Sequence, residues 1–207
     1  MLDPALLNPF FIKEYETKDD LRYVLLYGSE YSDDQVNFIK NTAKRLNAEI
    51  CAMGWPHEFA DRFLDPESSE EFQRCFAEAL FCFPSTFHGT VFTILHHKQF
   101  ITMGNELRGI KIKDLLGQLD LDNRFFKSDI KEYGSIDYET VDKMLAQLRE
   151  KSEAYLKEVL EKYSSKTGCG VVGVRSKCTG CRACEKICPK GAISMTEDPE
   201  GFLYPEV

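Results

Sequence analysis

Apolar and polar positions in the first 120 residues alternate between short apolar runs and stripes with helical spacing. Residues 23–29, YVLLYGS, form an apolar run, and residues 34–47 carry apolar side chains at helical spacing. The same order recurs, with further strand candidates at 47–55, 79–85 and 99–104 and helix candidates at 68–80, 89–98 and 110–119. Ser68 or Ser69 is the expected N-cap of the helix at 68–80. Strands that alternate with helices predict the α/β class, with a Rossmann-like parallel sheet and helices on both faces.

A longer helix is predicted at residues 138–163, where one apolar stripe faces Asp, Lys, Glu and Arg on the other sides. We interpret the stripe as packing on the α/β domain, with a dimerising coiled coil as the alternative. Residues 164–177 are rich in Gly, Ser and Thr and end the helix. The predicted organisation is therefore an α/β domain at 1–163, a linker at 164–177 and a partial ferredoxin-type domain at 178–207.

Composition narrows the class of protein. The chain has 207 residues, a net charge of −8 and a pI of about 5.1, which argues against binding to nucleic-acid phosphates. No apolar run approaches the roughly 20 residues that a membrane span needs, and the first residues have no basic start followed by an apolar core. We therefore expect a cytoplasmic protein without a membrane span.

Four of the eight cysteines lie close together near the C-terminus. Cys178, Cys181, Cys184 and Cys188, followed by Pro189, have the C-x2-C-x2-C-x3-C-P spacing of bacterial ferredoxins. The spacing predicts a 4Fe-4S cluster, and the small residues between the cysteines allow backbone amides to approach the sulfurs. A zinc site and a metal-free segment are the competing interpretations, although zinc favours two C-x2-C pairs set well apart.

The fourth ligand of the cluster is left open by the spacing. In two-cluster ferredoxins the last cysteine of such a run binds the other cluster. Cys188 could bind the same cluster as the other three, Cys169 could complete it, or a partner motif could follow the printed sequence. Cys51, Cys75 and Cys82 lie in apolar or helical contexts and are interpreted as buried small side chains.

A candidate ligand site lies at residues 81–92, FCFPSTFHGTVF, where a strand ends and a helix begins. Ligands of open parallel sheets bind beyond the carboxyl ends of the strands, where helix N–H groups can hold an anion. Gly89 allows close backbone approach, and His88 falls in the first turn of the helix. A packing or hydrogen-bonding role is the alternative for His88. His96 and His97 are interpreted as helix-end residues that favour the helix dipole.

The string STFHGTVFTILHHKQFITM resembles the hallmark of the polysaccharide pyruvyl transferase family, T-D-S-F-H-G-T-x-F-S-I-L followed by a short loop and K-P-F. MLDPALL resembles the family's V-L-D-P-T-L-L, and IKIKDLLGQLDLDNRF resembles its R-I-x-x-L-L-x-x-L-G-L-x-x-R. The segment IDYETVDKMLAQLREKSEAYL resembles the family's closing helix. The resemblance covers about residues 1–163.

This resemblance implies half of a GT-B architecture and transfer of an enolpyruvyl group from phosphoenolpyruvate to a sugar hydroxyl. His88 matches the motif histidine and is the candidate general acid or donor anchor. The candidates for binding the donor's anion are Ser85, Thr86, Gly89, Arg108 and Lys111. Ser85 replaces the motif aspartate and Lys111 replaces an arginine, which removes a planar fork of donors. The family's acceptor-binding half is not part of this sequence.

Residues 178–207 resemble the opening of the deazaflavin-dependent hydrogenase/dehydrogenase beta-subunit family, which continues with a second cysteine run. The resemblance favours a partner motif beyond Val207 and implies electron exchange with a ferredoxin or a flavoprotein. Our first hypothesis is a pyruvyl-transferase-like domain joined to a 4Fe-4S segment in a bifunctional protein. The alternatives are an electron-transfer protein or oxidoreductase subunit whose Rossmann-like domain docks a partner, and a non-catalytic binding protein.

Overall fold

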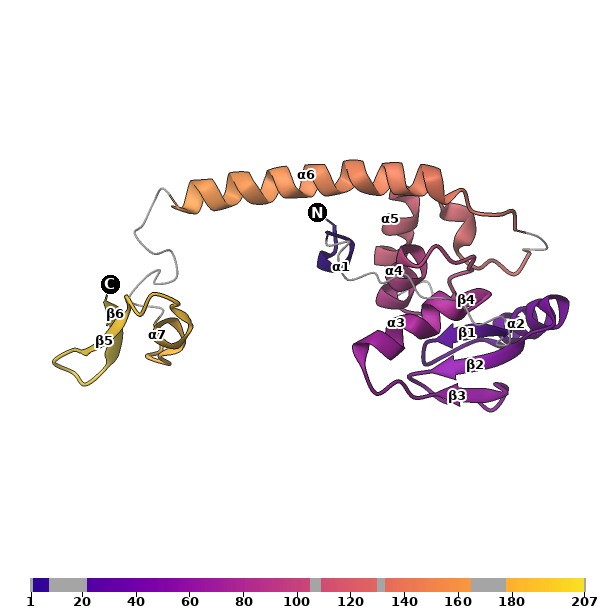
Figure 1. The fold of residues 1–207 in the computed structure, drawn as a ribbon, viewed down its shortest axis with the longest axis horizontal. Coiled ribbons are helices and arrows are strands. Elements are labelled where there is room, and N and C mark those ends of the chain that lie inside the picture. Colours follow the sequence, from indigo (N-terminus) through magenta and orange to yellow (C-terminus); the bar gives the residue numbers. More distant parts are fainter. Residues whose placement is uncertain (1, 8–21, 105–108, 130–132, 165–177, 207) are drawn as a thin grey trace. The chain divides into compact units, whose positions relative to one another are not determined.

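The computed structural model describes residues 2–7, 22–104, 109–129, 133–164 and 178–206 (Figure 1). The chain divides into two compact units, Met1–Glu150 and Lys151–Val207. None of the helices within the described ranges is long and apolar enough to cross a membrane. The expected linker at 164–177 lies almost wholly outside the described residues, so the domain boundary stays a prediction.

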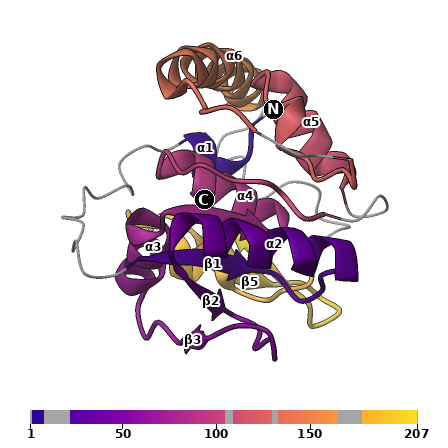
Figure 2. The same ribbon diagram turned by 90° about the vertical axis from the view of Figure 1, so that its right-hand side faces the viewer.

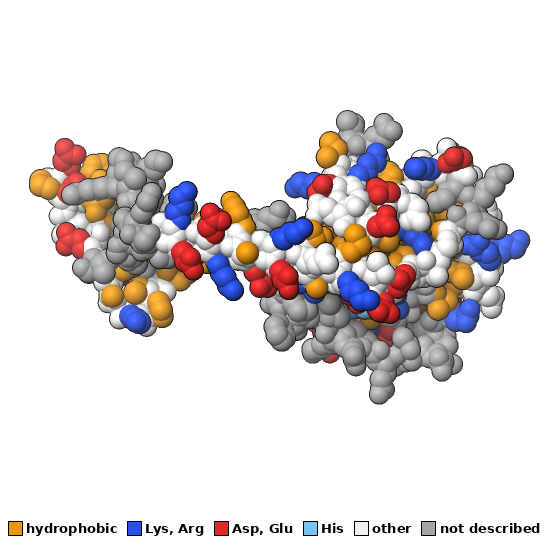
Figure 3. Space-filling model, turned by 90° about the horizontal axis from the view of Figure 1, so that it is seen from above, with side chains coloured by type: hydrophobic (Ala, Val, Ile, Leu, Met, Phe, Trp, Pro, Cys, Tyr) orange, Lys and Arg blue, Asp and Glu red, His pale blue; other side chains and the backbone are white. Residues whose placement is uncertain are grey.

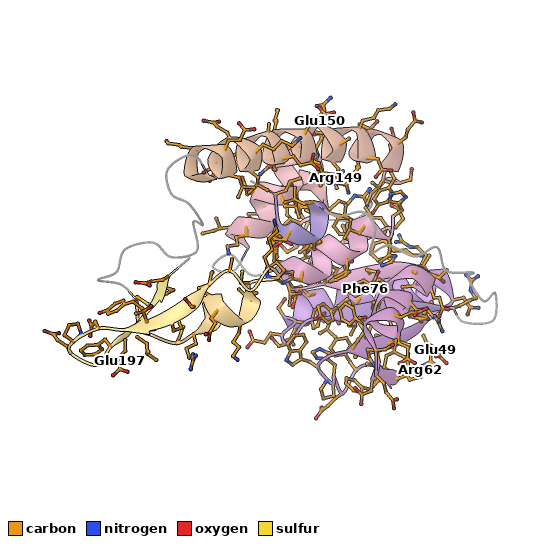
Figure 4. All side chains as sticks on the ribbon, turned by 60° about the vertical axis from the view of Figure 1, so that its left-hand side comes forward. Glu49, Arg62, Phe76, Arg149, Glu150 and Glu197 are labelled. Atoms are coloured by element: carbon orange, nitrogen blue, oxygen red, sulfur yellow. The ribbon has the colours of Figure 1, made fainter. Side chains whose placement is uncertain are left out.

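The first unit is built on a parallel sheet of four strands in the order β3-β2-β1-β4. The strands are β1 (Tyr23–Tyr27), β2 (Glu49–Met53), β3 (Arg62–Leu64) and β4 (Phe81–Pro84). In the centre of the sheet, Leu25 of β1 pairs with Cys51 on one side and Cys82 on the other. The apolar pattern of the sequence did not predict β3, which has only three residues. Its Arg62 lies 3.7 Å from Glu49 of β2, and Figure 4 labels both side chains.

Apolar side chains fill both faces of the sheet, as expected for strands covered by helices on each side. One face, with Leu25, Cys51 and Cys82, packs against four helices: α1 (Pro4–Leu7), α3 (Ser69–Glu78), α4 (Phe87–Leu95) and α5 (Ile110–Gln118). The other face, with Val24, Leu26 and Phe83, packs against α2 (Asp33–Leu46). Figure 2 shows α4 and α5 on the same side of the sheet. The predicted α/β class with helices on both faces is confirmed.

Hydroxyl side chains begin three of the helices. The Ser32 hydroxyl and the Gln35 side chain form a capping box at α2 (Asp33–Leu46). Ser68, rather than Ser69, caps α3 (Ser69–Glu78) by accepting from the Glu71 N–H. Thr86 caps the helix α4 (Phe87–Leu95), because its hydroxyl accepts the Gly89 N–H at 3.0 Å, and His88 lies in the first turn as predicted.

The strand predicted at 99–104 does not form a strand of the sheet. Residues in this stretch make only isolated bridges, Phe100 with Cys82 and Thr102 with Phe125. The Ile101 N–H donates to the Cys82 carbonyl at 3.2 Å, whereas the Thr102 N–H donates to the Arg124 carbonyl at 2.7 Å. The Met103 N–H also donates to the Pro84 carbonyl at 2.7 Å, so the stretch runs beside β4. Pro84 has no N–H to bond with the Ile101 carbonyl, and therefore no continuous ladder forms.

The remaining elements of the first unit are α1 (Pro4–Leu7), α5 (Ile110–Gln118), the 3-10 helix η2 (Asp122–Arg124) and the first part of α6 (Tyr138–Ser164). Val141 and Leu145 of α6 are 3% and 2% exposed, so this part of the predicted stripe packs on the α/β domain. Arg149, labelled in Figure 4, donates from Nε to the Leu6 carbonyl at 2.6 Å.

The second unit contains the rest of α6 and the cysteine-rich segment. Tyr155 and Leu160 of α6 are 56% and 65% exposed. Charged side chains of both signs surround apolar ones along this helix (Figure 3). The segment 178–206 forms a short helix α7 (Ala183–Ile187) and an antiparallel hairpin of β5 (Ser194–Glu197) and β6 (Leu203–Glu206). Ile193 is its buried apolar residue, 6% exposed.

Candidate functional site

The loop that carries the first cysteines is held in a tight turn by two residues with left-handed backbone. Gly180 has φ +66°, and a Cβ there would come within 3.1 Å of the Leu203 carbonyl of β6. Arg182 has φ 60°, and its guanidinium donates to both carboxylate oxygens of Glu185, at 2.9 and 3.1 Å. Arg182 is the N-cap of α7, so Cys181 lies just before the cap and Cys184 lies in the first turn of the helix.

Backbone amides surround two of the four thiols. The Ala192 N–H donates to Cys188 Sγ at 3.3 Å, and amides from Ala192 and Lys190 lower the pKa of this thiol. The pKa of the Cys181 thiol is also lowered, first by the Ala183 N–H and then by the Thr179 hydroxyl. Donors that favour thiolate over thiol are the environment that iron–sulfur ligands require. These residues therefore fit a 4Fe-4S cluster.

The cysteines are free and are not arranged around one ion. Cys181 is exposed, and Cys178, Cys184 and Cys188 are half-buried. In the described ranges, no three His, Cys, Asp or Glu side chains gather closely enough to hold a single metal ion. A cubane takes one thiolate at each iron, so its ligands stand further apart than the four ligands of a zinc ion.

The second candidate site lies between the carboxyl ends of β1 and β4. This is the switch point of the sheet, because the chain adds β2 and β3 on one side of β1 and then β4 on the other side. Crevices at this position are where doubly wound sheets bind ligands. Here an open cavity of about 650 Å³, which we call the β1–β4 hollow, is lined from the loop after β1 and the loop after β4. Its lining comprises Ser29, Glu30, Tyr31, Ser32, Gln35, Ser85, Thr86, Phe87, Met103 and Ile112.

Three predicted residues lie at this edge, each with a local structural partner. Ser85 lies so close to Gly28 that a Cβ on Gly28 would come within 1.7 Å of the Ser85 hydroxyl oxygen. The Thr86 hydroxyl is occupied as the cap of α4. A Cβ on Gly89 would meet Tyr27 Cδ1 at 2.6 Å, so the absence of a side chain at Gly89 makes room for the tyrosine ring.

His88 and Lys111 lie apart from the β1–β4 hollow. His88 is exposed, and its Nε2 lies 3.8 Å from Asp3 Oδ2. Lys111 and Asp3 line a separate cavity of about 290 Å³ beside α1 and α5, the α1–α5 hollow. Phe87 lines both hollows. The predicted Arg108 and Cys169 lie outside the described residues.

A third cavity adjoins the β1–β4 hollow and was not predicted. This lysine hollow, of about 450 Å³, shares Ser32 and Gln35 with the β1–β4 hollow. It is completed by Gly104, Lys113, Leu116, Asp122, Phe125, Phe126 and Lys127. The polar run that follows the apolar strand at 23–27 was a usable signal for the β1–β4 hollow. No local pattern marked Lys113 or Lys127.

His96, His97 and the cysteines of the sheet domain are held in place by burial or by neighbouring side chains. Burial lowers the pKa of His96 to about 4, so this side chain is neutral near pH 7. The prediction that His96 interacts favourably with the helix dipole is therefore wrong. His97 Nε2 lies 3.1 Å from Asp142, and its ring stacks on Tyr138. Cys51 and Cys82 are buried as predicted, whereas Cys75 is half-buried.

Comparison with known proteins supports the first site. Residues 171–194 match the family model of the 4Fe-4S binding domain, and the match contains all four clustered cysteines. No match to a pyruvyl transferase family or a deazaflavin-dependent hydrogenase family is found. No curated protein matches the chain, and no solved structure does. The C-terminal segment of this α/β protein is therefore a 4Fe-4S binding domain.

Proposed function

We propose that the protein transfers electrons through a 4Fe-4S cluster held by Cys178, Cys181 and Cys184, with Cys188 as a further ligand. The observation that carries the proposal is the ferredoxin spacing inside a matched 4Fe-4S domain. The amide donors at Cys181 and Cys188 support it, because such hydrogen bonds stabilise reduced cluster sulfurs and tune the potential. A cluster so close to an exposed surface serves exchange with a redox partner, a ferredoxin or a flavoprotein.

The test is the iron and acid-labile sulfide content of the full chain purified without oxygen, with its visible and electron paramagnetic resonance spectra. We expect about four irons and four sulfides per chain and a reversible low-potential couple. Cys184→Ser should lose the cluster. Cys75→Ser is the matched control, since Cys75 is a half-buried thiol outside the ferredoxin spacing.

Two further variants decide the fourth ligand. If Cys188 binds the same cluster, Cys188→Ser loses it and Cys169→Ser keeps it, whereas the reverse assigns the fourth position to Cys169. If both variants keep the cluster, the fourth position is filled by another ligand. Zinc in place of iron after anaerobic purification and reconstitution would refute the electron-transfer proposal.

Pyruvyl transfer is the second candidate function, for the first unit. Two motif pieces that carry the resemblance lie 85 positions apart in the sequence, and Asp3 of MLDP lies 3.8 Å from His88 of STFHGT. The Asp3 carboxylate lies beside the His88 ring, and α4 begins at the same place, so the first N–H groups of the helix can face an anion. We propose that His88 anchors phosphoenolpyruvate or protonates its methylene carbon while sugar hydroxyl oxygens add to C2 and the phosphate leaves, which gives a pyruvate ketal and inorganic phosphate.

Calorimetric titration with phosphoenolpyruvate tests this candidate. Binding should weaken by about tenfold or more in His88→Gln, as expected for one charge-assisted contact. His97→Gln is the matched control, because His97 is also an exposed histidine beside an aspartate. If His88→Gln and His97→Gln bind phosphoenolpyruvate with equal affinity, His88 does not contact the ligand. Together, the two results decide whether the protein is bifunctional.

A further inference from the structure

The β1–β4 hollow and the lysine hollow adjoin each other, and we call the two together the groove. Ser32 and Gln35 line both. Gln35 is held from both ends, because its Oε1 accepts the Ser32 N–H at 3.0 Å and its Nε2 donates to the Met103 carbonyl at 3.1 Å. The side chain thus forms a fixed boundary between two adjoining spaces, each of the size that takes a small ligand.

The β1–β4 half is acidic and rich in hydroxyl groups. Among the residues that the structure describes, its lining contains Glu30 and no Lys, Arg or His. Asp33 and Asp34 stand in the first turn of α2 beside it. These carboxylates oppose the binding of a phosphate, whereas a carboxylate and the Ser29 hydroxyl can hydrogen-bond to the hydroxyl groups of a neutral ligand.

The lysine half has the opposite charge. In the described part of its lining, Lys113 and Lys127 outnumber Asp122, the one acidic residue there. The Lys113 ammonium is held over the Phe125 ring, 4.8 Å from its centroid. Gly104 leaves room for the same ring, since a Cβ there would come within 3.1 Å of it. A positioned ammonium with a second lysine suits an anionic group such as a phosphate.

We propose that this groove binds a phosphorylated sugar, with its phosphate at Lys113 and Lys127 and its hydroxyl groups at Glu30 and Ser29. The charge pattern favours a ligand that is anionic at one end and neutral at the other, because the lysines attract an anion and Glu30 repels one. The proposal does not depend on the iron–sulfur cluster. It also differs from the phosphoenolpyruvate candidate, since His88 lies outside the groove.

Calorimetric titration of the full chain with hexose 1-phosphates, hexose 6-phosphates, the parent hexoses and inorganic phosphate tests the proposal. We expect at least one hexose phosphate to bind more tightly than its hexose and than inorganic phosphate. The double variant Lys113→Gln/Lys127→Gln should weaken its binding about 100-fold, roughly tenfold for each charge-assisted contact. Glu30→Gln should weaken it about tenfold while inorganic phosphate binding is unchanged or improved.

Lys40→Gln is the matched control, because the Lys40 ammonium also lies over a phenylalanine ring, 6.0 Å from the Phe59 centroid, and is outside the groove. Far-ultraviolet circular dichroism confirms that each variant is folded. Three results would overturn the proposal: no hexose phosphate binds, the double variant binds like wild type, or inorganic phosphate binds as tightly as every hexose phosphate. Phosphoenolpyruvate binding that is lost in His88→Gln and kept in the lysine double variant would leave the pyruvyl candidate intact in each case.

Discussion

Gly89 and Gly117 are both helical glycines, and we predict that the same substitution has opposite effects on them. In α4, the Cβ of Gly89→Ala would lie 2.6 Å from Tyr27 Cδ1, 2.9 Å from the Thr86 hydroxyl oxygen and 3.0 Å from Pro84 Cβ. In α5, the Cβ of Gly117→Ala would have Asp122 Oδ1 at 3.4 Å as its nearest neighbour, an ordinary contact. The helix gains from alanine in both cases, but only Gly89 has no space for it.

The magnitudes decide the sign. Alanine in place of a helical glycine stabilises by about 0.5–1 kcal/mol. Overpacking of a tightly packed site destabilises by about 1–3 kcal/mol. At Gly89, three neighbours are too close, and one of them is the hydroxyl that caps the helix, so we expect a net loss of about 1–2 kcal/mol in the free energy of unfolding. At Gly117 we expect a gain of about 0.5 kcal/mol.

Urea unfolding followed by tryptophan fluorescence measures both effects. Trp55 is the single tryptophan of the chain and packs edge-on against Tyr27, with ring centroids 5.6 Å apart. It therefore reports on the first unit and on the ring that Gly89→Ala would displace. With a slope of about 2 kcal/mol per molar urea, the midpoint should fall by about 0.5–1 M for Gly89→Ala. A rise of the midpoint would refute the packing argument and return Gly89 to a role in ligand approach alone.

Three further predictions follow from the described contacts. Thr86→Ala removes the cap of α4 and should lower the free energy of unfolding by about 1 kcal/mol, whereas Thr86→Ser should keep most of it, both measured by Trp55 fluorescence. Wild-type stability should fall as the pH drops from 6.5 towards about 4, because the unfolded chain takes up a proton that folded His96 resists, and His96→Gln should flatten this part of the pH profile. In metal-free protein, Cys188 should react with iodoacetamide at lower pH than Cys75, because burial raises the pKa of Cys75 to about 11 and backbone amides lower that of Cys188. Mass spectrometry of the labelled protein across pH measures the order. The reverse order would contradict the stabilisation of the Cys188 thiolate by the amides of Ala192 and Lys190.

The periodicity of apolar residues was sufficient to predict most of the fold. It located the strands near 23–27, 49–53 and 81–84 and the helices between them, because core-facing residues repeat at the period of each element. It did not predict β3, whose Arg62 and Phe63 are exposed, and it assigned residues 99–104 to the sheet. That stretch does run beside β4, with hydrogen bonds from Ile101 to Cys82 and from Met103 to Pro84, but the ladder is interrupted because Pro84 has no N–H.

The iron–sulfur site was determined by the sequence, because its chemistry depends on cysteine spacing within eleven consecutive residues. The groove on the sheet was decided by tertiary structure. Glu30 and Lys113 belong to one groove only because β1 lies between β2 and β4 and α5 returns to the same edge. Likewise, Asp3 meets His88 only through the packing of α1 beside α4. Local patterns record which face of each element is buried, whereas the order of strands in the sheet sets which loops meet, and that order is not written in any single stretch of the chain.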